Sequence, residues 1–274
     1  FHKSDWRETK MNLKRAKWSF NAAVAIFRRD MHVFWKEIGG NLLRIIGEPL
    51  FFLFVFGVLL PKLNLFRAGY IEILVPGIIS MSTMTGSMRG VAAGISLSFE
   101  YNEEIRAHIL TPISMRTLAL EKIICGTFQG IVSGTIVLAL ALIIFPGKFS
   151  FSSLFFFELL LIFIASGITF ASLGLALGSS FIPETMFEVL FIIMMPMMFF
   201  GATFYPLSLL PEVHPAFFYL TLFIPLTYIS EGIRAILTPE IAFLPAIYCF
   251  IGIGVYFLFF FSLGVWAFKR RAIK

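Results

Sequence analysis

Long apolar segments, separated by short polar or proline-containing stretches, account for most of the chain. Six of these segments have about the 20 residues that an α-helix needs to cross a bilayer. In order, they cover about 42–60, 71–98, 115 or 118–145, 151–181, 187–204 and 244–266. Pro183 and Glu184 leave only a very short loop between the fourth and fifth segments. The pattern predicts an all-α polytopic membrane protein with six transmembrane helices.

The stretch 201–237, between the fifth and sixth predicted spans, is apolar but broken. Four prolines interrupt it: Pro206, Pro211, Pro215 and Pro225. A single helix would not tolerate them, and the apolar pieces 216–223 and 226–236 are each too short to span a bilayer. We therefore expect two short helices that enter one face of the membrane and return. Such a re-entrant backbone is tolerated only where it packs against protein or lines a cavity.

The first 38 residues mix basic and large apolar side chains, most densely over 11–35. This mixture favours a helix that lies in the membrane interface, with its Lys and Arg side chains toward the headgroups. The alternative is ordinary basic charge flanking the first span. We expect 1–38 to form a cytosolic connecting helix and 39–274 to form the membrane domain. A nucleic-acid partner is not expected, because no other part of the chain has the composition of a soluble domain.

Composition supports the membrane class. Hydrophobic residues make up 58% of the 274 residues and charged residues 14%, whereas a soluble domain has about a quarter charged residues. Cys125 and Cys249 lie inside apolar segments and are expected to be small core residues. The first apolar run lies far from the start of the chain and has the length of a full span, so we expect no cleavable signal peptide.

The distribution of Lys and Arg predicts the orientation. Sixteen of them lie before residue 39, within 99–122 or after Trp266, whereas four lie in the stretches between the other span ends. Because Lys and Arg concentrate on the cytosolic side, we expect both termini and the polar segment 99–112 to be cytosolic. The stretch 201–237 would then face outward.

Some charged and small residues fall inside the predicted spans. Arg44 and Glu48 are four residues apart and can pair on one helix face. Arg89 requires an acidic or backbone partner, or an aqueous vestibule, and the sequence leaves both readings open. Small residues recur in the second span and permit close helix contact. They are Gly77, Gly86, Gly90 and Gly94.

No enzymatic constellation is visible. The four histidines are scattered without metal-ligand spacing, so we expect neither a metal site nor a catalytic residue. The one Gly-Lys pair, Gly147-Lys148, is followed by Phe149 and does not form a Walker A loop. If the protein uses ATP, we expect a separate polypeptide to hydrolyse it.

Three stretches together resemble the membrane subunit of a type-2 ABC exporter (the ABC-2 family), and the resemblance covers nearly the whole chain after Met11. The first is FEYNEEIRAHILTPISMRTLALEKIICG, from residue 99. The second is FFGATFYPLSLLPEVHPAFFYLTLFIPLTYISEGIRAIL, from residue 199. The third is the basic amphipathic start. Drug, lipo-oligosaccharide and polysaccharide exporters look most similar.

The resemblance implies a role for each region. The segment 99–112 would be a coupling helix that docks in a cleft of a cytosolic ABC ATPase, with 11–35 beside it as the connecting helix. The docking residues would be Glu100, Tyr101, Asn102, Glu103, Glu104, Ile105, Arg106 and Ile109. The re-entrant pair would cap the pathway, and the outer gate would include Phe204, Tyr205 and Pro206.

The resemblance also implies an assembly of two membrane subunits and two ATPases, with ATP and magnesium bound only by the ATPases. The protein would lie in the bacterial inner membrane among its lipids and export a lipid-linked glycan, lipid or hydrophobic drug. The pathway would run between the two copies. Its lining candidates are Phe51, Phe54, Met84, Met88, Met194, Met197, Met198 and Phe199.

Two other functions remain open from the sequence. An ion-coupled secondary transporter would require paired intramembrane carboxylates and an inverted repeat. Glu48 and Glu158 are poor evidence for such a pair, and no repeat is visible. The second alternative function is that of a membrane scaffold that transports nothing. Co-purification with a Walker A ATPase would favour the exporter over both.

Overall fold

The computed structural model describes residues 21–22, 24–36, 38–65, 69–100, 115–149 and 154–273. Every regular element within these ranges is a helix, and six helical segments are long and apolar enough to cross a membrane. The first span consists of α2 (Ile38–Phe52), the π-helix η1 (Leu53–Leu59) and α3 (Leu60–Lys62). The others are α4 (Tyr70–Glu100), α6 (Met115–Ile144), α7 (Phe155–Ser180), α8 (Pro183–Phe200) and α12 (Ala246–Ile273). The predicted six-span, all-α class is confirmed.

One predicted boundary is wrong. Pro183 and Glu184 do not form a loop, because α8 begins at Pro183 and Ile182 precedes it in an extended conformation. Proline is favoured in the first turn of a helix, where its missing N–H has no partner to lose. The fifth span therefore begins four residues earlier than its apolar pattern indicates.

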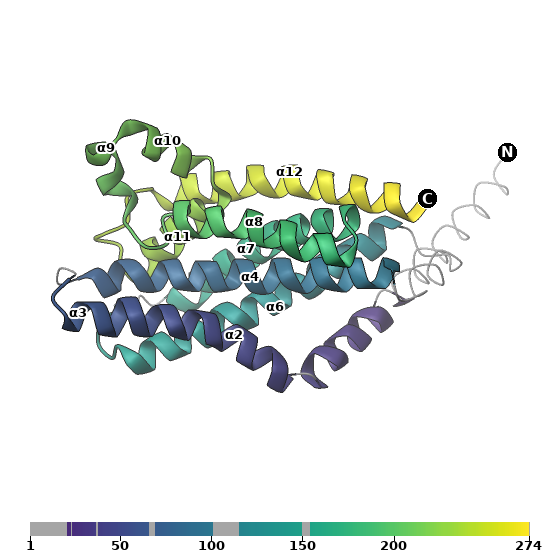
Figure 1. Cartoon of the computed structure of the whole chain (residues 1–274), viewed down its shortest axis with the longest axis horizontal. Helices are drawn as coiled ribbons and strands as arrows, with labels where there is room; N and C mark the ends of the chain where they lie inside the picture. Colours follow the sequence, from purple (N-terminus) through teal and green to yellow (C-terminus); the bar gives the residue numbers. More distant parts are fainter. Residues whose placement is uncertain are drawn as a thin grey trace, which may run out of the picture.

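Helices α4 and α7 form the centre of the bundle, and α2 and α12 lie at its edges (Figure 1). The close packing of α4 depends on small residues. A Cβ on Gly174 or Gly178 of α7 would lie 2.5 Å from a backbone oxygen of α4, so these glycines set the distance between the two helices. Of the four glycines predicted to allow close contact on α4, Gly77, Gly86 and Gly90 do so, whereas Gly94 has nothing within 4 Å.

The predicted re-entrant pair is confirmed. Short turns η2 (Leu207–Leu209) and α9 (Leu210–Val213) lead into α10 (Pro215–Leu222) and α11 (Pro225–Leu237), which meet at 90°. Both α10 and α11 begin with a proline, as helices readily do. The hydroxyl of Thr227 donates to the carbonyl oxygen of Thr221 at 2.6 Å and holds the corner between them.

Different helices meet at the two opposite ends of the bundle (Figure 1). At the end that we call the terminal end, α4, α7 and α12 finish and α6 and α8 begin. At the opposite end, the re-entrant end, α9, α10 and α11 gather. Residues 24–36 are helical, as predicted, and pack beside α6 near the terminal end through Phe34 and Phe128, whose ring centroids are 6.4 Å apart. The predicted amphipathic residues before 21 lie outside the described ranges.

Candidate functional sites at the two ends of the bundle

The predicted coupling segment joins two long helices at the terminal end. Helix α4 continues through Phe99 and Glu100, and α6 begins at Met115. The other docking candidates fall outside the described residues, and their roles stay predictions. They are Tyr101, Asn102, Glu103, Glu104, Ile105, Arg106 and Ile109. The described part of the site is therefore the pair of helix ends that hold this segment.

Arg271 of α12 fixes the end of α4. Its guanidinium donates to the carbonyl oxygens of Gly178 and Phe181 at 3.1 and 2.6 Å. It also lies 3.4 Å from the carboxylate of Glu100 and 4.8 Å from the centre of the Phe99 ring, a cation–π distance. One side chain thus connects the last turn of α4 with the turn between α7 and α8.

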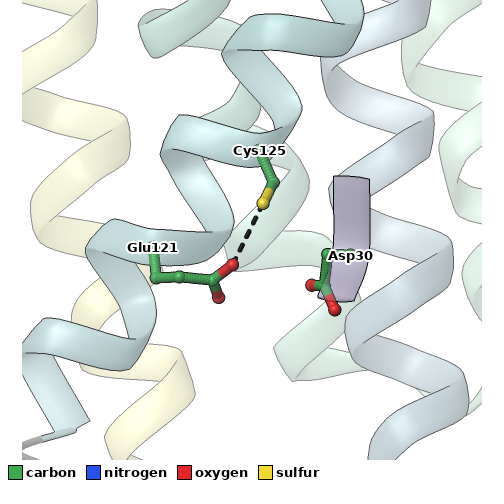
Figure 2. A group of neighbouring side chains, drawn as sticks. All are labelled: Asp30, Glu121 and Cys125. Carbon is green, nitrogen blue, oxygen red and sulfur yellow. Dashed lines mark hydrogen bonds between the residues drawn. The ribbon is translucent and has the colours of Figure 1, made fainter. Parts of the chain in front are cut away.

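The start of α6 is fixed by a second group of charges, partly shown in Figure 2. The ammonium of Lys122 pairs with Asp30 of the amino-terminal helix and lies 3.5 Å from the carboxylate of Glu121. The thiol of Cys125 donates to the other oxygen of Glu121 at 3.0 Å. Glu121 is buried, where an unpaired carboxylate would be costly. The amino-terminal helix is thereby tied to the span that follows the coupling segment.

Asp30, Glu121 and Cys125 also place three possible ligand atoms within 4.8 Å of one another (Figure 2). Lys122 already supplies positive charge to both carboxylates. A metal ion would have to displace that ammonium or lie against it at a high electrostatic cost. We therefore interpret the group as an ion-paired link between helices.

At the re-entrant end, a buried ion pair anchors α11. The side chains of Glu231 and Arg234 are both 0% exposed and pair one turn apart. Arg234 also donates to the carbonyl oxygens of Ile73 and Ala202 at 3.1 and 2.9 Å. Additional hydrogen bonds offset the cost of burying a charge pair, although the Nε of Arg234 has no partner among the described residues. This arginine therefore joins α11 to α4 and to the turn after α8.

The other oxygen of Glu231 accepts two backbone N–H groups, from Phe243 at 2.8 Å and Leu244 at 3.3 Å. These residues lead into α12, so the same carboxylate also holds the entrance to the last span. Ser230 and Ser80 of α4 add a buried hydroxyl pair at 2.7 Å. The re-entrant helix α11 is thus fixed to α4, to the segment that leads into α12 and to the turn after α8 by buried polar contacts.

The predicted outer-gate residues lie beside this network. The ring of Phe204 is 5.3–5.6 Å from the rings of Phe52, Phe56 and Phe199, and its carbonyl oxygen accepts the hydroxyl of Tyr70 at 3.1 Å. Pro206 is buried. Tyr205 is partly buried, and this burial raises the pKa of its phenol, so the phenol stays neutral. Their gating role stays a prediction.

The predicted pathway-lining residues separate into two groups. Phe51, Phe54 and Phe199 are between 48% and 61% exposed on the single chain and are available to a partner or a substrate. The five methionines are buried in the core of the chain: Met84, Met88, Met194, Met197 and Met198. In this conformation the methionines pack between helices of one chain. Their assignment to the pathway is untested and stays a prediction.

The sequence left open whether Arg89 of α4 has an acidic partner, and the structure shows one. Its guanidinium lies 3.3 Å from the carboxylate of Glu48 in α2. The side chain of Arg44, the predicted partner of Glu48, is outside the described side chains. The pair is partly exposed, with 48% of the Arg89 side chain and 30% of the Glu48 side chain accessible. Arg89 lies 11 residues before the end of α4, about 16 Å along the helix.

An open apolar groove of about 560 Å³ lies between α8 and the re-entrant segments. We call it the apolar groove. Its walls are Met195, Pro196, Phe199, Phe200, Tyr205, Leu210 and Phe217. Two of these residues, Phe199 and Tyr205, are predicted pathway or gate residues. The groove therefore offers an aliphatic or aromatic group a place next to the predicted gate.

Sequence reasoning did not select the residues that hold the described parts of these sites. Arg271 entered it only as a charge that indicates orientation. Arg234 and Lys122 entered it in the same way and as members of the two resembling stretches, without a partner. A signal did exist for one pair, because Glu231 and Arg234 are three residues apart in an otherwise apolar stretch and can meet on one helix face. The partners of Lys122 and Arg271 come from distant parts of the chain, and spacing does not reveal them.

The fold and these links define a class: a polytopic helical membrane protein whose polar contacts tie helix ends together. Comparison with known proteins gives the family. The family model of the ABC-2 type transporter matches residues 21–238, and the chain belongs to this family. It is 24% identical over 218 residues to the inner membrane transport permease YadH of Escherichia coli (strain K12) and of Shigella flexneri, covering 78% of this chain and 81% of each relative. No solved structure matches the chain significantly.

Proposed function

We propose that the chain is the membrane subunit of an ATP-driven exporter in the bacterial inner membrane, with both termini in the cytosol. Two copies would enclose the pathway, and two copies of a separate ABC ATPase would drive it. Membership of the ABC-2 family supports the partnership with an ATPase, and the name of the YadH relative supports transport at an inner membrane. The concentration of basic residues supports the orientation.

The main support for the coupling role comes from the contacts that hold the end of α4 and the start of α6, on either side of 101–114. Arg271 ties the end of α4 to α12 and to the turn between α7 and α8. Lys122 ties the start of α6 to the amino-terminal helix. A segment that transmits movement from an ATPase has to be attached stiffly to several spans at once. These links satisfy that requirement on both sides of the segment.

The pair of Arg89 and Glu48 supports a pathway between two copies. A charged pair within the spans is costly against lipid and normally faces protein or water. Its exposed position on the single chain therefore favours a second subunit or an aqueous pathway over the α2 and α4 face. Phe51 and Phe54 are exposed on α2 and η1 nearby. Together they suit an amphipathic substrate, such as a lipid-linked glycan, a lipid or a hydrophobic drug.

Docking can be tested by charge reversal in the coupling segment. We expect Glu103→Lys with Glu104→Lys to abolish co-purification of the ATPase, because acidic residues that fix docking would become repulsive. The matched control is Glu212→Lys with Glu240→Lys, which makes the same charge change at exposed positions of the re-entrant end. Both variants should remain folded in detergent. Normal ATPase association of the coupling variant would refute the docking role.

The transport role needs a separate measurement. The purified chain with its ATPase, in vesicles, should hydrolyse ATP faster when an exported amphiphile is present. Cargo movement that proceeds equally well without any ATPase would contradict the proposal and favour a secondary transporter. ATPase binding with no stimulated hydrolysis for any amphiphile tested would favour a scaffold.

A further inference from the structure

A second groove lies at the terminal end, between the end of α7, the start of α8 and the last turns of α12. We call it the basic groove; its volume is about 340 Å³. Its walls are Ser179, Ser180, Ile182, Trp266, Ala267, Arg270 and Arg271. It shares no residue with the apolar groove or with the predicted pathway. Two guanidinium groups and two hydroxyl groups in a small concave site have the chemistry of an anion site.

One arginine of this groove has no counter-charge among the residues that the structure describes. Arg271 pairs with Glu100 and donates to two carbonyl oxygens, so it forms a fixed wall. Arg270 has no carboxylate within ion-pair distance among the described residues. It lies over the ring of Trp266, 5.3 Å from the ring centre, which orients the guanidinium plane but leaves its N–H groups available.

A buried hydroxyl provides an independent observation. Ser179 is 3% exposed, lines the groove, and its Oγ has no hydrogen-bond partner among the described residues. Its neighbour Ser180 instead donates to the carbonyl oxygen of Ala176 at 2.7 Å, one turn back. Buried hydroxyl groups normally have a partner. The Oγ of Ser179 has almost no accessible surface in this conformation, so this unused donor would reach a ligand in the groove through a change of its side-chain rotamer.

The surroundings of the groove indicate a ligand that is both anionic and apolar. Trp266 is 57% exposed, and Ile182 is 49% exposed at the rim. Exposed apolar side chains continue along α12 away from the groove, including Phe259 and Leu263. Tryptophan is enriched at the level of the lipid headgroups. A phospholipid places its phosphate at this level and its chains along the adjoining helix face, whereas a free anion would use only the polar half of the site.

We propose that the basic groove is a binding site for the phosphate of an anionic phospholipid in the leaflet at the terminal end. Arg270 supplies the charge, Ser179 donates a hydrogen bond to a phosphate oxygen, and Trp266 holds Arg270 and packs against the glycerol region. Because Arg271 forms the opposite wall and also holds Glu100, a bound lipid would stabilise the end of α4 next to the coupling segment. Basic pockets between transmembrane helices are known to take such headgroups.

The test is lipid binding to the purified chain in a neutral detergent, followed by native mass spectrometry with added phosphatidylglycerol or phosphatidylcholine. We expect phosphatidylglycerol to bind more tightly than phosphatidylcholine. Arg270→Gln should weaken phosphatidylglycerol binding by about five-fold, the loss expected for one basic residue near a membrane surface, and Ser179→Ala should weaken it as well. The matched control is Lys269→Gln, which removes the neighbouring charge outside the groove and should leave binding unchanged.

Three outcomes would overturn the proposal. Equal losses in Arg270→Gln and Lys269→Gln would show nonspecific attraction to surface charge. Equal binding of both lipids would remove the role of the anionic headgroup. Inorganic phosphate that raises the melting temperature of the lipid-free protein in an Arg270-dependent way, and displaces the lipid at millimolar concentration, would assign the site to a soluble anion. Ser179→Ala changes only one buried oxygen, so it tests the groove even if Arg270→Gln folds poorly.

Discussion

The two ends of the bundle are held by the same type of arginine–glutamate contact, but the side chains that form it are buried to different extents. At each end, one arginine donates to two backbone carbonyl oxygens of other segments and pairs with one glutamate. At the re-entrant end these are Arg234 and Glu231, both 0% exposed. At the terminal end they are Arg271 and Glu100, with side chains 20% and 45% exposed.

This difference in burial has energetic consequences. Removing one partner of a buried pair leaves an uncompensated charge and costs about 3–5 kcal/mol, whereas exposed pairs contribute about 0–1 kcal/mol. The re-entrant end is therefore expected to behave as a fixed part of the fold. The contacts of Arg271 at the terminal end are expected to contribute less to the free energy of unfolding, although they still attach the end of α4 to α12 and to the turn between α7 and α8.

The largest expected effect is that of Arg234→Met. The substitution leaves the carboxylate of Glu231 buried without its counter-charge, and we expect a loss of about 3–5 kcal/mol in the free energy of unfolding. The measurement is thermal unfolding in detergent, followed by size-exclusion chromatography. The double variant Glu231→Gln with Arg234→Met should recover part of the loss, because a neutral amide still accepts from the N–H groups of Phe243 and Leu244. A single variant as stable as the unmodified chain would remove the distinction between the ends.

A second test uses two glycines of α4, one near each end. A Cβ at Gly77 would lie 2.0 Å from the backbone oxygen of Thr203, whereas a Cβ at Gly94 meets nothing within 4 Å. Gly77→Ala should cost about 1–3 kcal/mol, as overpacking does. Gly94→Ala should be neutral or stabilise the helix by up to about 1 kcal/mol. The measurement is the melting temperature of each variant under the same conditions. Equal shifts for the two variants would contradict tight packing at the re-entrant end.

The third test concerns Arg271→Met. Because the side chain is partly exposed, we expect a loss of about 1–2 kcal/mol in stability, smaller than for Arg234→Met. The proposed coupling role predicts a larger effect on ATP hydrolysis stimulated by substrate, since the end of α4 loses its attachment to α12. The control is Lys269→Met on the same turn, which lies outside the basic groove and keeps the bonds of Arg271 to Gly178 and Phe181. Full stimulation in Arg271→Met would argue against its role in coupling.

The helices were predictable from the sequence because burial in a membrane requires long apolar segments, and some prolines begin a new helix, although Pro76 and Pro196 lie inside α4 and α8. The re-entrant pair was recognisable from Pro215 and Pro225 for the same reason. The links between helices were not predictable, since Asp30 and Lys122, or Glu100 and Arg271, are distant in the chain. Arg89 illustrates the limit: its need for a partner followed from its depth, but the choice of Glu48 depends on how α2 packs against α4.

The smallest expected change in stability belongs to this pair, and it separates structure from function. Because Arg89 and Glu48 are partly exposed on the single chain, Arg89→Gln should change the free energy of unfolding by no more than about 1 kcal/mol. If the α2 and α4 face borders a pathway, the same variant should alter the substrate concentration that half-stimulates ATP hydrolysis. The control is Arg89→Lys, which keeps the charge and should retain most of the stimulation. A large loss of stability with unchanged stimulation would instead make the pair a structural link, like that of Arg234 and Glu231.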